Sequence, residues 1–222
     1  MPPNLTLSDA FGGTLAAVIL LLQFGLLRGT VIDDQVKLYA AQSIVVAAYT
    51  AGAGVAVGGL DLYVLAVLTV AFKVIAVPLV IRTLTRNLPD IAKEVPLALN
   101  VPFTLILGVI LTGIAYLTTV RLPIAGVLLP RSAMAVAVAV TLLSLLLIAT
   151  RLNSVTQLIG FLTLDNAIYF GTVAIAPGLP LVLGILIFFP LIIAVLVFAI
   201  LVRLLERRSA TLVVDRLTEL RG

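Results

Sequence analysis

Long apolar runs separated by short polar links recur along the whole chain of 222 residues. A helix needs about 20 apolar residues, rising 1.5 Å each, to cross about 30 Å of hydrocarbon. Seven runs meet this requirement, with approximate bounds of 12–28, 36–57, 61–82, 97–119, 132–150, 154–176 and 180–204. The pattern therefore predicts an all-α integral membrane protein with seven transmembrane helices. We expect a single membrane domain, 1–222, that ends in a cytoplasmic tail at 205–222.

Composition strengthens this interpretation and narrows the chemistry. The chain is 62% hydrophobic and 11% charged, with a mean hydropathy of +1.29, so it has too few polar residues to cover a soluble domain. It contains no Cys and no His, which excludes thiolate and imidazole metal sites and iron–sulfur ligation by cysteine. We find no nucleotide-binding loop or nucleophile motif either. We therefore expect no resident cofactor or metal, and no catalysis of bond chemistry by this chain alone.

The lysines and arginines are distributed unequally between the two sides of the predicted bundle. The N-terminus and every second link together carry only Arg121 and Arg131. The opposite side carries eleven, with Lys73 the remaining one of 14: Arg28, Lys37, Arg82, Arg86, Lys93, Arg151, Arg203, Arg207, Arg208, Arg216 and Arg221. Because cytoplasmic loops carry the excess of positive charge, this predicts an outside N-terminus and a cytoplasmic C-terminus.

The chain also shows a possible internal repeat. Segments 26–83 and 146–203 share one order of features: the end of a span, a basic link, a span dotted with polar residues, a short neutral link and an apolar span that ends in Arg. Two pairs of identical residues match at an offset of 120, Leu38 with Leu158 and Tyr49 with Tyr169. Since one span separates the two units, spans 1–3 and 5–7 run in the same direction. We expect a parallel repeat, in contrast to the inverted repeats of many transporters.

Two full charges lie deep inside predicted spans, Asp165 in the sixth and Lys73 in the third. An Asp at the centre of a membrane helix costs about 2.5–3.5 kcal/mol on insertion scales, so such residues usually face a protein interior and serve charge movement. One interpretation is that both residues belong to a proton path. The alternative is a structural ion pair, or a neutral buried acid that packs helices together.

Other polar residues accompany these charges. Tyr169 lies one turn after Asp165 and can hydrogen-bond its carboxylate, and Gln42 lies on a polar face of the second span with Tyr39 and Tyr49. Such polar stripes either hydrogen-bond neighbouring helices or line a water-filled path. Pro78, five residues after Lys73, predicts a kink in the third span because proline frees a backbone carbonyl.

The span around Asp165 resembles a known family. The run Gln157-Leu-Ile-Gly-Phe-Leu-Thr-Leu-Asp-Asn-Ala167, with seven spans and the Lys73–Pro78 pattern, is similar to hydrogenase-4 component E. That family typically reads Gly-Phe-Leu-x-x-Glu-Asn-Gly in this span. Here Gly160, Phe161, Leu162 and Asn166 match, Asp165 replaces the Glu, and Ala167 replaces the Gly.

The resemblance implies a role in a larger assembly. Members of this family are membrane subunits of formate hydrogenlyase and related group 4 hydrogenase complexes, and their later part is similar to the K-type subunit of complex I and the C-type subunit of Mrp antiporters. It implies a non-catalytic, multi-pass subunit in the inner or plasma membrane of a prokaryote. Its partners would be lipid and the antiporter-like and anchor subunits of a complex I-like, ion-translocating complex. Asp165, Lys73, Tyr169 and Gln42 would contribute to its proton path. The alternatives are a free-standing carrier of small solutes or ions, an Mrp-type antiporter subunit and a purely structural scaffold.

Overall fold

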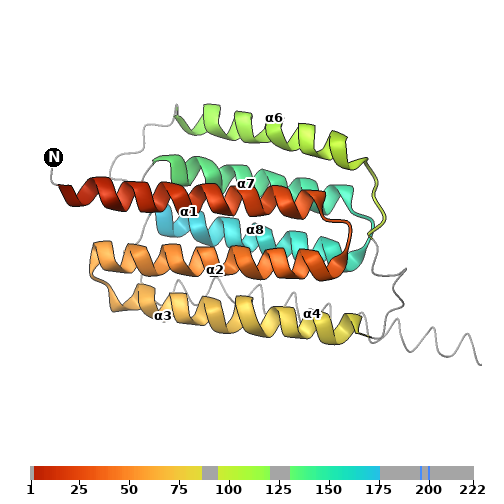
Figure 1. Ribbon diagram of the computed structural model, residues 1–222, viewed down its shortest axis with the longest axis horizontal. Helices are drawn as coiled ribbons and strands as arrows, with labels where there is room; N and C mark the ends of the chain where they lie inside the picture. The colour runs from red at the N-terminus through yellow and green to blue at the C-terminus, as the bar shows by residue number, and fades with distance from the viewer. Residues whose placement is uncertain (1–2, 87–94, 121–130, 176–195, 197–199, 201–222) are drawn as a thin grey trace, which may run out of the picture.

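The computed structural model describes residues 3–86, 95–120 and 131–175, together with residues 196 and 200. Every regular element named within the described ranges is helical, which confirms the predicted all-α class (Figure 1). The helices are α1 Pro3–Arg28, α2 Ile32–Val57, α3 Leu60–Thr69, η1 Val70–Ala76, α4 Val77–Thr85, α6 Val101–Val120, α7 Arg131–Thr150 and α8 Ser154–Ile175. The predicted seventh span, 180–204, and the predicted tail, 205–222, lie outside the described residues.

Within the described ranges, six helices are long and apolar enough to cross a membrane. They are Phe11–Arg28, Ile32–Val57, Leu60–Thr85, Val101–Thr119, Ser132–Thr150 and Ser154–Ile175. The third of these is continuous through α3, η1 and α4, because no break in helical backbone separates the three elements.

The helices lie side by side with nearly parallel axes (Figure 1). α1, α2, α7 and α8 form the centre, since α1 packs on both α2 and α7 while α8 packs on both α2 and α7. α6 covers α7 and α1 on one flank, and the α3–η1–α4 helix covers α2 on the other. A tight turn joins α2 to α3, where Gly58 has φ 75° and its N–H bonds the Gly54 carbonyl at 2.9 Å. Glycine adopts this left-handed conformation without the strain that a Cβ would add.

The third membrane helix changes its winding around Lys73. Residues Val70–Ala76 form a π-helix, and the N–H of Val77 bonds the Phe72 carbonyl five residues back. Pro78 follows directly and has no N–H to donate. The sequence predicted a kink at Pro78, and the structure shows a wider helical turn just before it. Such π-turns within α-helices are frequent at functional sites.

A short backbone pairing closes one end of the bundle. Leu97 and Arg151 form an antiparallel bridge, with Ala98 N–H bonding the Thr150 carbonyl at 3.0 Å and Leu152 N–H bonding the Pro96 carbonyl at 3.2 Å. The pairing uses residues just before α6 and just after α7. The predicted fourth span begins near residue 97, whereas α6 begins at Val101, because Leu97 is held in the bridge and the Ala98 N–H bonds the Thr150 carbonyl.

Candidate functional site

Lys73 and Asp165 meet in the middle of the bundle. The Lys73 Nζ atom lies 2.5 Å from Asp165 Oδ2, and the side chains are 0% and 10% exposed. Lys73 comes from η1 and Asp165 from α8, so the contact joins the flanking third membrane helix to the centre of the bundle. The two deep charges that the sequence singled out therefore form a buried ion pair, in which each provides the countercharge that the apolar surroundings cannot.

Tyr169 completes this pair from one turn further along α8. The Lys73 Nζ atom lies 5.1 Å from the centroid of the Tyr169 ring, within the range of a cation–π contact. The sequence suggested a hydrogen bond from Tyr169 to the carboxylate of Asp165. That hydrogen bond stays a prediction. The ring of Tyr169 faces the ammonium group, so both α8 residues contact the same cation.

Gln42 lies in a separate chain of buried polar side chains beside the ion pair. Its Nε2 donates to Gln23 Oε1 at 2.9 Å, and its Oε1 accepts from Asn166 Nδ2 at 3.4 Å. Asn166 Nδ2 also donates to Ser43 Oγ at 2.9 Å. Because Asn166 follows Asp165 on α8, this network begins next to the ion pair and extends away from it toward α1.

The network continues through residues that the sequence reasoning did not select. Gln23 Nε2 donates to Ser144 Oγ at 3.2 Å, and Ser144 Oγ lies 3.0 Å from Thr163 Oγ1. All of these side chains are fully buried. Gln23 could have been noticed as a lone amide in an apolar run, but its partner is 121 residues away and only the fold brings them together.

These polar groups form a layer between two apolar clusters. On α1, Leu26 and Leu27 belong to one cluster and Ile19 to the other, with Gln23 between them. The same alternation occurs along α8, where Leu162 and Phe170 lie on opposite sides of the polar residues. Apolar packing therefore separates the ion pair and its network from both ends of the described bundle.

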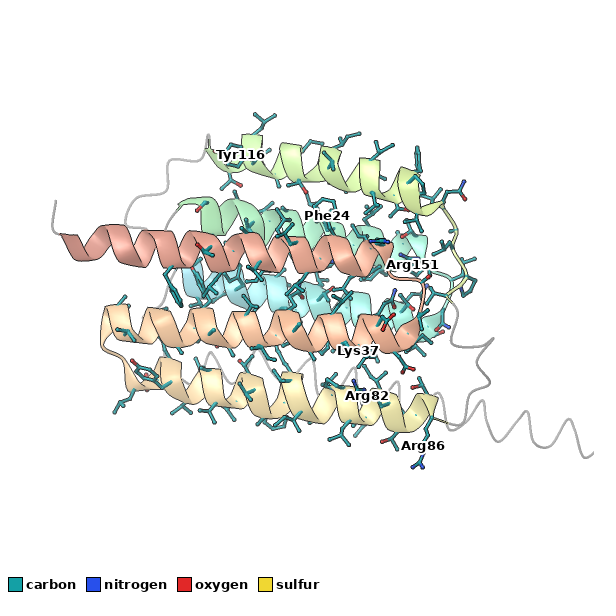
Figure 2. All side chains as sticks on the ribbon, viewed as in Figure 1. Phe24, Lys37, Arg82, Arg86, Tyr116 and Arg151 are labelled. Atoms are coloured by element: carbon teal, nitrogen blue, oxygen red, sulfur yellow. The ribbon has the colours of Figure 1, made fainter. Side chains whose placement is uncertain are left out.

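A third buried charge, Arg151, lies apart from this layer at the end of α7. The side chain is 1% exposed, and its Nη2 donates to the carbonyl of Leu27 in the last turn of α1. Figure 2 shows it beside the end of α1. Its backbone carbonyl accepts from Gln157 Nε2 at 2.8 Å. Burial lowers the pKa of Arg151, but an arginine starts so far above neutral that it keeps its charge.

The hydroxyl stripe of the fourth membrane helix does not join either site. Each of its threonine hydroxyls donates to the backbone carbonyl four residues back: Thr104 to Asn100 at 3.1 Å, Thr112 to Gly108 at 2.9 Å and Thr119 to Ala115 at 2.6 Å. The hydrogen atoms of these hydroxyls are therefore used within one helical turn rather than between helices. No group of three Asp, Glu, His or Cys side chains that could hold a metal occurs among the residues that the structure describes.

Curated relatives of this chain share one name. The chain is 31% identical over 185 residues to "Hydrogenase-4 component E" of Escherichia coli K12. The alignment covers 83% of this chain and 85% of that protein. Proteins of the same name from Escherichia coli O157:H7 and Shigella flexneri match equally well. The chain belongs to the hydrogenase-4 component E family. No family model and no solved structure match it.

The motif residues around Asp165 that resemble the family pattern are the ones through which α8 makes its close contacts with other helices. A Cβ at Gly160 would lie 2.7 Å from Ile148 Cγ1 on α7, so only glycine permits this approach of the two helices. Asn166 bonds α2, and Asp165 bonds Lys73. In this member of the component E family, the short motif thus brings α8 into contact with three neighbouring helices.

Proposed function

We propose that this chain is a membrane-arm subunit of a multisubunit, ion-translocating complex of the complex I-like or group 4 hydrogenase-like kind. Its curated relatives are named as components of hydrogenase-4, which supports a place in an assembly. Asp165 and Lys73 act in its proton path, with Tyr169 and Gln42 beside them. Larger antiporter-like and anchor subunits pack against it in the membrane, and redox cofactors reside in partner subunits.

The buried ion pair carries this proposal. Asp165 and Lys73 hold one negative and one positive charge 2.5 Å apart between apolar layers. A proton bound at Asp165 removes the countercharge of Lys73 and leaves a lone ammonium group inside the bundle, which is energetically costly. Proton uptake at this site is therefore linked to a compensating movement of charge nearby, which is the property that a coupling element needs.

The proposal includes a topology. The N-terminus lies outside and the C-terminus in the cytoplasm of a prokaryotic cell, with 180–204 as a seventh span and spans 1–3 and 5–7 as parallel repeats. Figure 2 shows Lys37, Arg82, Arg86 and Arg151 toward one end of the bundle, which supports assigning that end to the cytoplasm. The packing of α1 on α7 and of α2 on α8 pairs equivalent helices of the two proposed repeats.

Replacing Asp165 by Asn tests the function. The tagged variant is purified with its native partners, and proton uptake by inverted membrane vesicles is measured during turnover. We expect the same partner subunits to copurify, while coupled proton uptake falls by roughly tenfold or more. Asp34→Asn is the matched control, because Asp34 is an exposed acid that pairs with Lys37 on the surface of α2.

Three results would contradict the proposal. If Asp165→Asn prevents assembly, and Asp165→Glu restores assembly without proton uptake, the carboxylate has a structural role only. If the purified chain alone moves solutes or ions across liposomes, it is a free-standing carrier. Copurification with antiporter subunits and no redox subunit would instead place it in an Mrp-type antiporter.

A further inference from the structure

The amide and hydroxyl network beside the ion pair closes on itself. It begins at Asn166 on α8, continues through Gln42 on α2 and Gln23 on α1 to Ser144 on α7, and returns to α8 at Thr163. We call these five residues the polar belt. Each of the four central helices contributes at least one member, and all members are 0% exposed. The belt therefore ties the four central helices together at one level.

The chemistry of the belt is unsuited to carrying protons. Three of its members are amides, which neither gain nor lose a proton near neutral pH. The two hydroxyls also contact backbone carbonyls of their own helices, Ser144 that of Val140 at 2.8 Å and Thr163 that of Gly160 at 2.9 Å. The amides donate in one direction, from Asn166 to Gln42 to Gln23 to Ser144, so a change at one member affects the next.

The belt also sets the orientation of α8 about its own axis. Thr163 contacts α7, Asn166 contacts α2, and Asp165, between them in sequence, contacts Lys73 of η1. Successive helical residues point about 100° apart, so these three contacts face three directions. If the contacts at Thr163 and Asn166 are in place, α8 cannot turn Asp165 away from Lys73.

We propose that Gln23, Gln42 and Asn166 are positioning residues that keep Asp165 in its ion pair with Lys73, and so regulate when the carboxylate can take up a proton. This rests on the proposed function, in which Asp165 is the proton-accepting group. A carboxylate held against an ammonium group is protected from protonation, and loosening the belt exposes it. The belt and the ion pair thus have separate tasks: the belt orients and the pair exchanges protons.

Labelling of Asp165 by dicyclohexylcarbodiimide tests this proposal. The reagent adds to the protonated form of a carboxyl group, and the adduct at Asp165 is quantified by peptide mass spectrometry on the native complex in membranes. Gln42→Met loses both hydrogen bonds that Gln42 makes in the belt. We expect Asp165 to label roughly fivefold faster or more in this variant, since the loss of even one buried hydrogen bond implies a change of that size. Gln35→Met is the matched control on the same helix. Gln35 is also fully buried and donates to the Gly29 carbonyl at 2.9 Å, outside the belt. In Gln35→Met we expect the labelling rate of Asp165 to stay within about twofold of that in the unmodified protein.

Equal labelling of Gln42→Met and Gln35→Met would overturn the proposal, since it would reveal general loosening of α2. If Gln42→Met fails to assemble, Ser144→Ala opens the belt by loss of one hydroxyl, and unchanged labelling of that variant overturns it equally. The measurement is made at rest, without turnover. Continued proton uptake in Asp165→Asn would refute the proposed function. The labelling experiment does not depend on that result, because it measures only how well the belt holds Asp165 against Lys73.

Discussion

Lys73 and Arg151 are both buried cations, yet the protein compensates their charges in different ways. Lys73 lies deep within a membrane helix and contacts a carboxylate at 2.5 Å and an aromatic ring at 5.1 Å. Arg151 lies one residue beyond α7 and donates to a backbone carbonyl in the last turn of α1. The Nε and Nη1 atoms of Arg151 have no hydrogen-bond partner among the described residues.

The position along the membrane helices explains this difference. The carbonyls at the C-terminal end of a helix carry a partial negative charge of roughly half an elementary charge, which favours a nearby cation. Arg151 can use the end of α1 in this way. None of the described membrane helices ends near Lys73, which lies at mid-span, so Lys73 requires a full countercharge from another helix. A buried charge at mid-span therefore indicates that a second, opposite charge lies nearby. A buried cation at the C-terminal end of a helix does not, because the helix carbonyls stabilise it.

The largest expected effect comes from removing one member of the ion pair. Lys73→Met or Asp165→Leu alone leaves a lone buried charge, and we expect each to lower the free energy of unfolding by about 3–5 kcal/mol. The double variant removes both charges and restores most of the stability, because apolar replacement of a buried pair is often close to neutral. Unfolding of the purified chain in mixed micelles, followed by circular dichroism, measures all three.

The double variant also separates stability from function. It should assemble with its partners and yet fail in coupled proton uptake, because both charged groups of the proposed proton path have been removed. Losses that simply add in the double variant would mean that the two charges do not stabilise each other.

A smaller effect is expected at Gly160, which lies on α8 between the level of Asp165 and that of Arg151. In Gly160→Ala the new Cβ would approach Ile148 Cγ1 to 2.7 Å and the Ile148 backbone nitrogen to 3.4 Å. Overpacking of this kind costs about 1–3 kcal/mol. Ile148→Ala in the same chain should relieve part of the loss. Gly113→Ala on α6 is the control, since nothing lies within 4 Å of its Cβ and the helix propensity of alanine favours it.

The pairing of Lys73 with Asp165 was among the alternatives that the sequence allowed, because the signal for it lies in the sequence alone. A charge in an apolar run stands out without any knowledge of the fold, and two such charges in one chain are natural partners. The helices themselves were predictable for the same reason, because a membrane requires about 20 apolar residues per crossing.

The polar belt and the burial of Arg151 were not predictable in this way. Gln23 meets Ser144 only because α1 packs on α7, and neither residue has a neighbour in sequence that indicates this contact. In the sequence, Arg151 is one of eleven basic residues on one side of the predicted bundle, and nothing near it indicates burial. Its burial follows from the bridge between Leu97 and Arg151, which places it under the segment before α6. Both features depend on contacts between distant segments.

The smallest effect is expected at Arg151 itself. Arg151→Met loses a charge-assisted hydrogen bond to the Leu27 carbonyl but also removes two buried nitrogen atoms that lack partners in the described part of the chain. These contributions oppose each other, so we expect a loss of only about 1 kcal/mol in the same unfolding measurement. Arg151→Lys keeps the charge, so its stability should lie between that of the unmodified protein and that of Arg151→Met. If Arg151→Met destabilises the protein as strongly as Lys73→Met, then Arg151 also has a full countercharge, supplied by an acid beyond the described residues or by a partner subunit.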